Sequence, residues 1–271
     1  MSALVVEDLQ VQIPGPDREP ITIVSEIGMR VEPGRILGIA GESGSGKTIS
    51  SLAVMGLLPR GSRVTGSILL GGTELVGMRE SQLRGLRGRR VAMVFQDPLS
   101  SLHPMLTIGA QMTDHMRRHL GLNRSDATRK AADLLGRVRL PNPQKLVDVY
   151  PHQLSGGMRQ RVAIAIALAC DPQVLIADEP TTALDVTVQA GILELFDQLR
   201  SEIGIATVVI THDLGVLSSI ADDMVVFQSG RIVESGPSGE LFTAPKHPYT
   251  RTMLAALSTV TRDEQSTPER R

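Results

Sequence analysis

Cysteine is nearly absent from this sequence, since Cys170 is the only one among 271 residues. A single thiol excludes an internal disulfide framework. Cys170 lies in the apolar stretch VAIAIALAC, where we interpret it as a small buried hydrophobic residue. We therefore expect the chain to work in a reducing compartment.

The sequence also lacks an excess of one charge and a long apolar run. Its formal net charge is −1, so no basic field exists to hold nucleic acid non-specifically, and we expect no nucleic-acid partner. No apolar run approaches the roughly 20 residues that cross a bilayer, and the N-terminus MSALVVEDLQ does not resemble a secretory signal. In a membrane process, such a chain would have to dock onto partner chains that span the bilayer.

Hydrophobic residues make up 41% of the chain, which suits one large α/β domain with subdomains. Alternating apolar residues in ALVVEDLQVQI and ITIVSEIGMRV predict an N-terminal antiparallel β subdomain. Apolar segments such as ILGIA, VLIAD and ATVVIT alternate with helical patterns, which predicts a parallel core sheet. We predict a main domain over residues 1–235, a helical subdomain inserted at about 97–160, and a C-terminal tail over 236–271 whose end is disordered.

A glycine-rich loop follows the apolar strand ILGIA. Its residues GESGSGKT match the pattern G-x-x-x-x-G-K-[ST] between a strand and a helix, which is the context that this phosphate-binding motif requires. The glycines let backbone N–H groups converge on phosphate oxygens, Lys47 supplies a charge to the outer phosphates, and Thr48 can bind Mg²⁺. The alternative is a glycine-rich turn with a surface lysine. The predicted nucleotide-binding residues are Gly41, Glu42, Ser43, Gly44, Ser45, Gly46, Lys47 and Thr48.

Two acidic residues stand where the strand VLIAD ends. Asp178 should emerge at the carboxyl edge of a parallel sheet, where ligands bind in such folds, and its oxygen suits Mg²⁺. Glu179 follows and can polarise the attacking water as a general base. The alternative is an acidic pair that caps a helix before Pro180. His212 ends the strand ATVVIT and should lie on the same rim, although a histidine there would by itself be structural.

The motif LSGGM, followed by RQRVAIAIAL, resembles the ATP-binding cassette (ABC) family, and the resemblance extends over nearly the whole chain. It implies a P-loop NTPase fold that hydrolyses ATP in a head-to-tail dimer. In this family the LSGG loop contacts the γ-phosphate of ATP held by the partner subunit, which implies that Ser155, Gly156 and Gly157 act across the dimer. Ser155 is a good N-cap, and the two glycines leave backbone N–H groups open to an anion. An ordinary helix cap is the alternative for LSGG alone.

The resemblance also implies roles for residues that carry no signal alone. Gln96 in VFQDP resembles the glutamine loop, which senses Mg²⁺ and the attacking water and joins the helical subdomain to the membrane partner. Asp185 in TALD resembles the loop that crosses the dimer interface, and His212 resembles the histidine that holds the γ-phosphate. The implied cofactors are ATP and Mg²⁺. The implied catalytic residues are Glu179, His212, Gln96 and Lys47, and the implied magnesium contacts are Thr48, Gln96 and Asp178.

Within the family, the segments FQDPLSSLHP, YPHQLSGGM, IADEPTTALDVTVQA and APKHPYTRTML resemble ATPases of peptide and nickel importers. We expect peptides as the solute, with nickel as the alternative. Two features depart from the pattern. An aromatic ring usually stacks on adenine, but the matching segment REPITIV has none, and we assign that place to Ile21. Many peptide-importer ATPases also carry a C-terminal cysteine-rich extension, which the lone Cys170 cannot supply; a nickel-type importer, a trimmed chain or half of a fused pair would account for this.

The resemblance implies a position at the cytoplasmic face of the inner membrane. The expected partners are a second ATPase subunit, either a homologous chain or a copy of itself, two integral membrane permease subunits and, indirectly, an extracytoplasmic solute-binding protein. Two other classes compete with this interpretation. A non-transport ABC ATPase that acts on DNA or ribosomes would show coiled-coil insertions or two cassettes, and a P-loop kinase would lack LSGGM.

Overall fold

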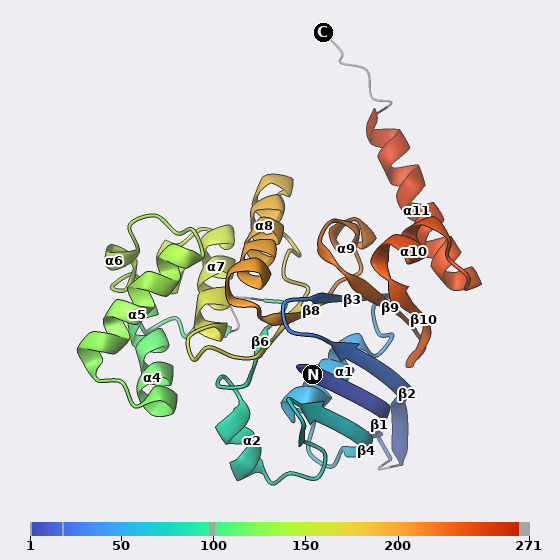
Figure 1. Ribbon diagram of the computed structural model, residues 1–271, viewed down its shortest axis with the longest axis horizontal. Coiled ribbons are helices and arrows are strands. Elements are labelled where there is room, and N and C mark those ends of the chain that lie inside the picture. Colours follow the sequence, from blue (N-terminus) through green and yellow to red (C-terminus); the bar gives the residue numbers. More distant parts are fainter. Residues whose placement is uncertain (1, 18, 98–100, 266–271) are drawn as a thin grey trace.

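A six-stranded sheet forms the centre of the computed structural model, which describes residues 2–17, 19–97 and 101–265 (Figure 1). The strand order is β10-β9-β3-β8-β7-β6, and only β10 runs antiparallel to its neighbour. Every residue of β3, β7 and β8 is buried, because helices and the second sheet cover both faces. The predicted parallel core sheet is confirmed. Its strands are β3 Ile36–Gly41, β6 Val91–Val94, β7 Val174–Asp178, β8 Ala206–Ile210, β9 Asp223–Gln228 and β10 Arg231–Pro237.

The second sheet is the predicted N-terminal antiparallel one, with strand order β2-β1-β4-β5. Figure 1 shows it below the core sheet, with helix α1 (Lys47–Met55) between them. Apolar side chains from both sheets and from α1 form one core cluster, which fixes the start of α1 against the end of β3. The strands of this sheet are β1 Leu4–Pro14, β2 Pro20–Val31, β4 Arg63–Leu70 and β5 Thr73–Glu74, and the short helix α2 (Glu80–Leu86) follows β5.

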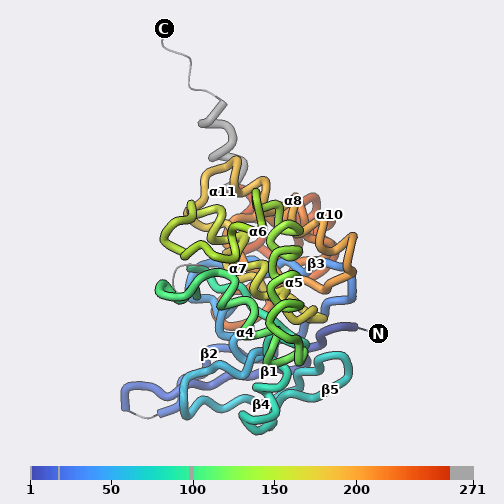
Figure 2. The backbone as a smooth tube through the Cα atoms, turned by 90° about the vertical axis from the view of Figure 1, so that its left-hand side faces the viewer, coloured from blue at the N-terminus to red at the C-terminus, as the bar shows by residue number. Residues whose placement is uncertain are grey.

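The region expected to be a helical subdomain holds helices, and Figures 1 and 2 show α4, α5 and α6 gathered on one side of the molecule. Side-chain oxygens of Thr107 and Asn123 cap α4 and α5, which explains where these helices begin. The boundary that we predicted for the subdomain stays a prediction. The helices and the 3₁₀ turn here are α4 Ile108–Leu120, α5 Arg124–Arg137, α6 Pro143–Leu146, η1 Pro151–Gln153 and α7 Gly156–Ala167.

The remaining helices of the described residues are α8 Val186–Ile203, α9 Leu214–Ile220, α10 Ser238–Thr243 and α11 Pro248–Gln265. Helix α11 extends to Gln265, and residues 266–271 lie outside the described residues. The expected disorder at the end of the tail stays a prediction. In Figure 1, α11 extends away from the two sheets. None of the described helices is both long and apolar enough to pass through a bilayer.

Candidate nucleotide site

A cleft of about 660 Å³ opens at the carboxyl edge of the core sheet. It brings together the glycine-rich loop after β3 and the segments that follow β6, β7 and β8. Parallel strands end at the same edge, so this convergence follows from the strand order. The residues that line the cleft are Ile23, Glu42, Ser43, Gly44, Ser45, Gly46, Lys47, Thr48, Ile49, Gln96, Asp178, Glu179 and His212.

The glycine-rich loop has a backbone that only glycine accommodates at its first position. Gly41 has a φ of 149°, and a Cβ there would meet the carbonyl oxygen of Phe227 at 2.5 Å. Lys47 begins α1, and its Nζ donates hydrogen bonds of 2.7 Å to the carbonyl oxygens of Gly41 and Glu42. Burial lowers the pKa of Lys47, while the carboxylates of Glu179 and Asp178 raise it. The site therefore holds a desolvated cation, which suits an anionic phosphate.

Asp178 lies at the end of β7 with only 4% of its surface exposed. Burial raises the pKa of its carboxyl, and a hydrogen bond from the side chain of Thr48 opposes that effect. Its Oδ1 is buried and has no hydrogen-bond partner among the described residues. An orphaned buried carboxylate oxygen beside a hydroxyl fits a hard cation such as Mg²⁺.

The described residues contain no group of three or more His, Cys, Asp or Glu side chains able to hold a metal by themselves. A magnesium site here would therefore draw on Thr48, Asp178 and Gln96, which all line the cleft, and on oxygens of the bound nucleotide. Mg²⁺ commonly keeps such a mixed set, with one or two carboxylates and substrate phosphates. The residues present fit the predicted metal.

Glu179 is held in a strained and fully engaged arrangement. Its backbone has a φ of 50°, an uncommon value for a residue with a side chain, and its N–H donates to the carbonyl oxygen of Ile210 at 2.8 Å. Its Oε1 lies 2.8 Å from Nδ1 of His212, and its Oε2 accepts from the hydroxyls of Thr182 at 2.9 Å and Thr211 at 3.3 Å. These contacts fix the orientation of the Glu179 carboxylate.

The two threonines are site residues that the sequence analysis missed. Thr211 directly follows β8, and Thr182 lies three residues after Glu179. A hydroxyl at a strand end on the same rim was the available signal, but threonines are too common at such places to be singled out by type alone. The two hydroxyls hold one oxygen of the Glu179 carboxylate, while the other oxygen contacts His212. Glu179 and His212 therefore lie together at the edge of the sheet, as we expected.

The LSGG segment forms the start of α7, where the side chain of Ser155 accepts a hydrogen bond from the N–H of Met158 at 3.3 Å. Asp185 caps α8 in the same way, accepting from the N–H of Val188 at 2.9 Å. The two helix starts are in close contact, because a Cβ on Gly157 would meet a methyl group of Val188 at 2.5 Å. These two segments therefore form one packed unit.

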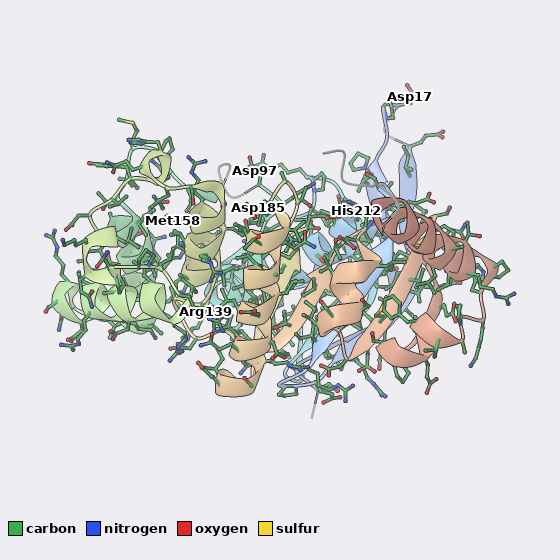
Figure 3. The ribbon with its side chains drawn as sticks, turned by 90° about the horizontal axis from the view of Figure 1, so that it is seen from above. Asp17, Asp97, Arg139, Met158, Asp185 and His212 are labelled. Atoms are coloured by element: carbon green, nitrogen blue, oxygen red, sulfur yellow. The ribbon has the colours of Figure 1, made fainter. Side chains whose placement is uncertain are left out.

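The LSGG and Asp185 segments do not contribute to the lining of the cleft among the described residues. Figure 3, which looks down on the molecule, places Asp185 between Met158 and His212. The two motifs therefore do not line the cleft that holds the glycine-rich loop of their own chain. Such separation is what a site completed by a second subunit requires.

Ile21, the side chain that we expected against adenine, is 45% exposed and is not among the described residues that line the cleft. Ile23, two residues further along β2, lines it instead. The packing of β2 against the loop accounts for this, since the carbonyl oxygen of Gly230 accepts from Ser25 and its N–H donates to Ser45. Ile23 replaces Ile21 as the aliphatic candidate for the adenine face.

Comparison with known proteins agrees with this geometry. The family described as ABC transporter matches residues 24–182, more than half of the chain. The chain belongs to the ABC transporter family. The predicted family, its ATPase fold and its ATP-hydrolysing activity are therefore confirmed.

This ABC transporter ATPase is similar in sequence to proteins named as peptide-transport ATP-binding proteins. It is 46% identical over 266 residues to the dipeptide transport ATP-binding protein DppD of Escherichia coli, covering 98% of this chain and 81% of the relative. A putative peptide import ATP-binding protein of Brucella abortus is 48% identical over 238 residues, covering 88% and 72%. Among solved structures, a dimeric ATP-binding cassette with bound ADP and Pi has a TM-score of 0.76 at 25% identity, covering 87% of this chain and 98% of that one.

Proposed function

We propose that this ATPase powers the import of peptides across a membrane. The observation that carries the proposal is the single cleft in which Lys47, Asp178 and Glu179 meet. The choice of peptides rests on the likeness to relatives named as dipeptide transport and peptide import proteins. Nickel is the alternative solute, because the sequence also resembles the ATPases of nickel importers. The subunits that select the solute are other chains.

In the proposed site, the glycine-rich loop holds the phosphates of ATP. Backbone N–H groups at the start of α1 and the ammonium of Lys47 face the phosphoryl oxygens. Thr48 and Asp178 would hold Mg²⁺, with Gln96 beside them, and the ion would supply positive charge to the oxygens of the transferring phosphoryl group. We assign adenine to the side of the loop where Ile23 lies.

The hydrolytic step needs a base next to the γ-phosphate, and Glu179 is placed for it. Its carboxylate accepts the proton of the attacking water while the water oxygen bonds to the γ-phosphorus and the bond to ADP breaks. His212 contacts the same carboxylate through Nδ1 at 2.8 Å, so one side chain can link the base to the γ-phosphate that it is assigned to hold. The threonine contacts keep the base oriented before the substrate arrives.

A second ATPase subunit would complete the site. Ser155, Gly156 and Gly157 present a helix N-terminus that does not line the chain's own cleft, and Val188 near the start of α8 packs against Gly157. Val186, which follows Asp185, leaves 83% of its surface exposed and is therefore open to contact with a partner. In the proposed head-to-tail pair, these segments meet the partner's ATP, and the partner is a homologous chain or a second copy.

The membrane partners would dock in a groove beside Gln96. A cavity of about 240 Å³ lies between the core sheet and α7, and the half-exposed side chains of Leu57 and Phe95 border it. Exposed apolar side chains next to the glutamine loop suit a helix of a permease subunit. Two permease subunits would then place this chain at the cytoplasmic face of the inner membrane, and an extracytoplasmic solute-binding protein would act on it indirectly.

The role of Glu179 is tested by Glu179→Gln, which keeps the size of the side chain and removes the base. We expect hydrolysis to fall about 100-fold or more while ATP still binds, because general-base catalysis contributes on that order. Phosphate release and fluorescent-nucleotide binding measure the two effects. Glu202→Gln, an exposed position at the end of α8, is the matched control. Undiminished hydrolysis by Glu179→Gln would overturn the assignment.

The transport role is tested with the complex purified from membranes. We expect integral membrane subunits to copurify and peptides to stimulate ATP hydrolysis by the reconstituted assembly. Stimulation by nickel instead of peptides would replace the proposed solute. Recovery of ribosomes or DNA without membrane subunits would contradict a transport role altogether.

A further inference from the structure

The C-terminal tail reaches the glycine-rich loop through one tyrosine. Tyr249 lies in the first turn of α11, and its hydroxyl accepts a hydrogen bond of 3.2 Å from the backbone N–H of Glu42. The two residues are 207 positions apart. The ring of Tyr249 packs against the main hydrophobic core, so the hydroxyl is presented by an anchored side chain.

The contact falls on a peptide group that Lys47 also uses. The peptide between Gly41 and Glu42 offers its carbonyl oxygen to Nζ of Lys47 at 2.7 Å and its N–H to Tyr249. When Lys47 turns to a phosphate, the carbonyl loses that bond and the N–H bond to the tail remains. Gly41 ends β3 at a φ of 149°, a value that residues with a side chain rarely adopt, and the peptide that follows it joins the sheet to the glycine-rich loop.

The start of α11 is itself fixed to the core sheet. The carboxylate of Glu234, in β10, accepts hydrogen bonds from the N–H groups of Lys246 at 2.7 Å and His247 at 3.1 Å. The N–H of Tyr249 in turn donates to Nδ1 of His247 at 3.3 Å. The position of the phenol is therefore set by the edge of the sheet through a short series of hydrogen bonds.

We propose that Tyr249 is a positioning residue for ATP binding, which holds the Gly41–Glu42 peptide in the orientation that the phosphates require. The inference rests on the proposed role of the glycine-rich loop. Orientation before binding lowers the entropy lost when the ligand arrives, so the contact acts on affinity. It does not reach the Glu179 carboxylate, so the hydrolytic step itself is left unchanged.

The test is Tyr249→Phe in the full chain, which removes the hydroxyl and keeps the packed ring. We expect the Kd for a fluorescent ATP analogue and the KM for ATP to rise about 2- to 10-fold, the range that one net hydrogen bond supports. We expect kcat and Tm to stay at the wild-type values. Tyr150→Phe is the matched control, because Tyr150 is the only other tyrosine and is 39% exposed.

A second variant tests the series of bonds behind the tyrosine. Glu234→Ala should also raise the Kd for the ATP analogue. The double variant with Tyr249→Phe should bind the analogue no more weakly than the weaker-binding single variant, because both changes break the same series of hydrogen bonds. Additive losses would contradict this linkage.

Lys47→Ala separates the two levels of the proposal. If Lys47→Ala binds the analogue as tightly as the wild type, the phosphate site itself is misassigned. If Lys47→Ala fails to bind while Tyr249→Phe binds normally, only the role of Tyr249 is overturned. A fall in Tm with equal losses in kcat and affinity for Tyr249→Phe would mean a merely structural role and would also overturn the proposal.

Discussion

Lys47 and Asp178 carry opposite charges into the floor of the cleft, where little water reaches them. Only 6% of Lys47 and 4% of Asp178 are exposed. Burial shifts both pKa values toward the neutral forms, upward for Asp178 and downward for Lys47, although their mutual attraction opposes this. Both charges are therefore unfavourable in the ligand-free chain.

Asp178→Asn should therefore raise the Tm of the metal-free chain at pH 7 by a few degrees. The pKa of Asp178 is higher in the folded chain than its ordinary value of 3.8. Between these two pKa values the folded state binds more protons than the unfolded state, and above them ionisation of the carboxyl lowers the free energy of unfolding. The gain in Tm should vanish as the pH falls below 3.8, where the carboxyl is protonated in both states. Circular dichroism melts across this pH range measure the effect.

The same variant should lose the additional stabilisation that Mg²⁺ with ATP gives to the wild type. Asp148→Asn, at an exposed position, serves as the control and should change neither quantity. A lower Tm for Asp178→Asn at pH 7 would contradict the interpretation that its charge is unfavourable without a ligand.

Single residues of the site were predictable where a motif fixed their spacing. GESGSGKT, Asp178 and Glu179 follow from local patterns, and His212 follows from its place at a strand end. The contact of Tyr249 with Glu42 has no local signal, because it depends on how the last helix folds back onto the sheet. The sequence analysis assigned the adenine place to Ile21 alone, because only tertiary packing shows that Ile23 of the same strand lines the cleft.

The starts of α5 and α7 have the same architecture but different expected roles. In each, the side-chain oxygen of the capping residue accepts a hydrogen bond from the backbone N–H three residues later. The capping residue is Asn123 in α5 and Ser155 in α7. A cap of this kind contributes about 1 kcal/mol. The α7 cap is the one proposed to face the partner's ATP.

Asn123→Ala and Ser155→Ala should each lower the free energy of unfolding by about 1 kcal/mol. Only Ser155→Ala should also lower the ATPase activity of the assembled transporter, because it alters the helix N-terminus that we propose to contact the partner's ATP. Urea denaturation and phosphate release measure the two quantities. Equal effects of both variants on activity would mean that the LSGG segment acts only as a helix cap.

Elements with strong apolar patterns were predicted, and those without them were not. The buried strands β3, β7 and β8 have continuous apolar runs, and such runs predict buried strands directly from the sequence. Helix α2 has no buried residue, so it gives no apolar period. Its two partly buried leucines pack against the core. Arg87 adds polar anchoring, because it bonds the carboxylate of Glu80 and the carbonyl oxygens of Met55 and Gly56. Such polar anchoring leaves no pattern to find.

Assembly of the whole transporter depends on surfaces that the single chain leaves open. Val186→Asp should lower the ATPase activity of the purified transporter about tenfold or more, because a charge buried without a partner at the dimer interface costs several kcal/mol. Nucleotide binding by the single chain should be unchanged. Ile203→Asp, an exposed aliphatic position at the opposite end of α8, is the control. Normal activity of Val186→Asp would place the interface elsewhere.

The order of strands in the core sheet also determines when the site can form during synthesis. Strand β3, which carries the glycine-rich loop, lies between β8 and β9, whose residues come from the last third of the chain. Long-range pairing of parallel strands is slow because a large loop must close first. A ribosome that has made the loop must therefore add nearly two hundred more residues before β3 gains both neighbours. The nascent chain therefore has no complete nucleotide cleft until β8 and β9 have both been made.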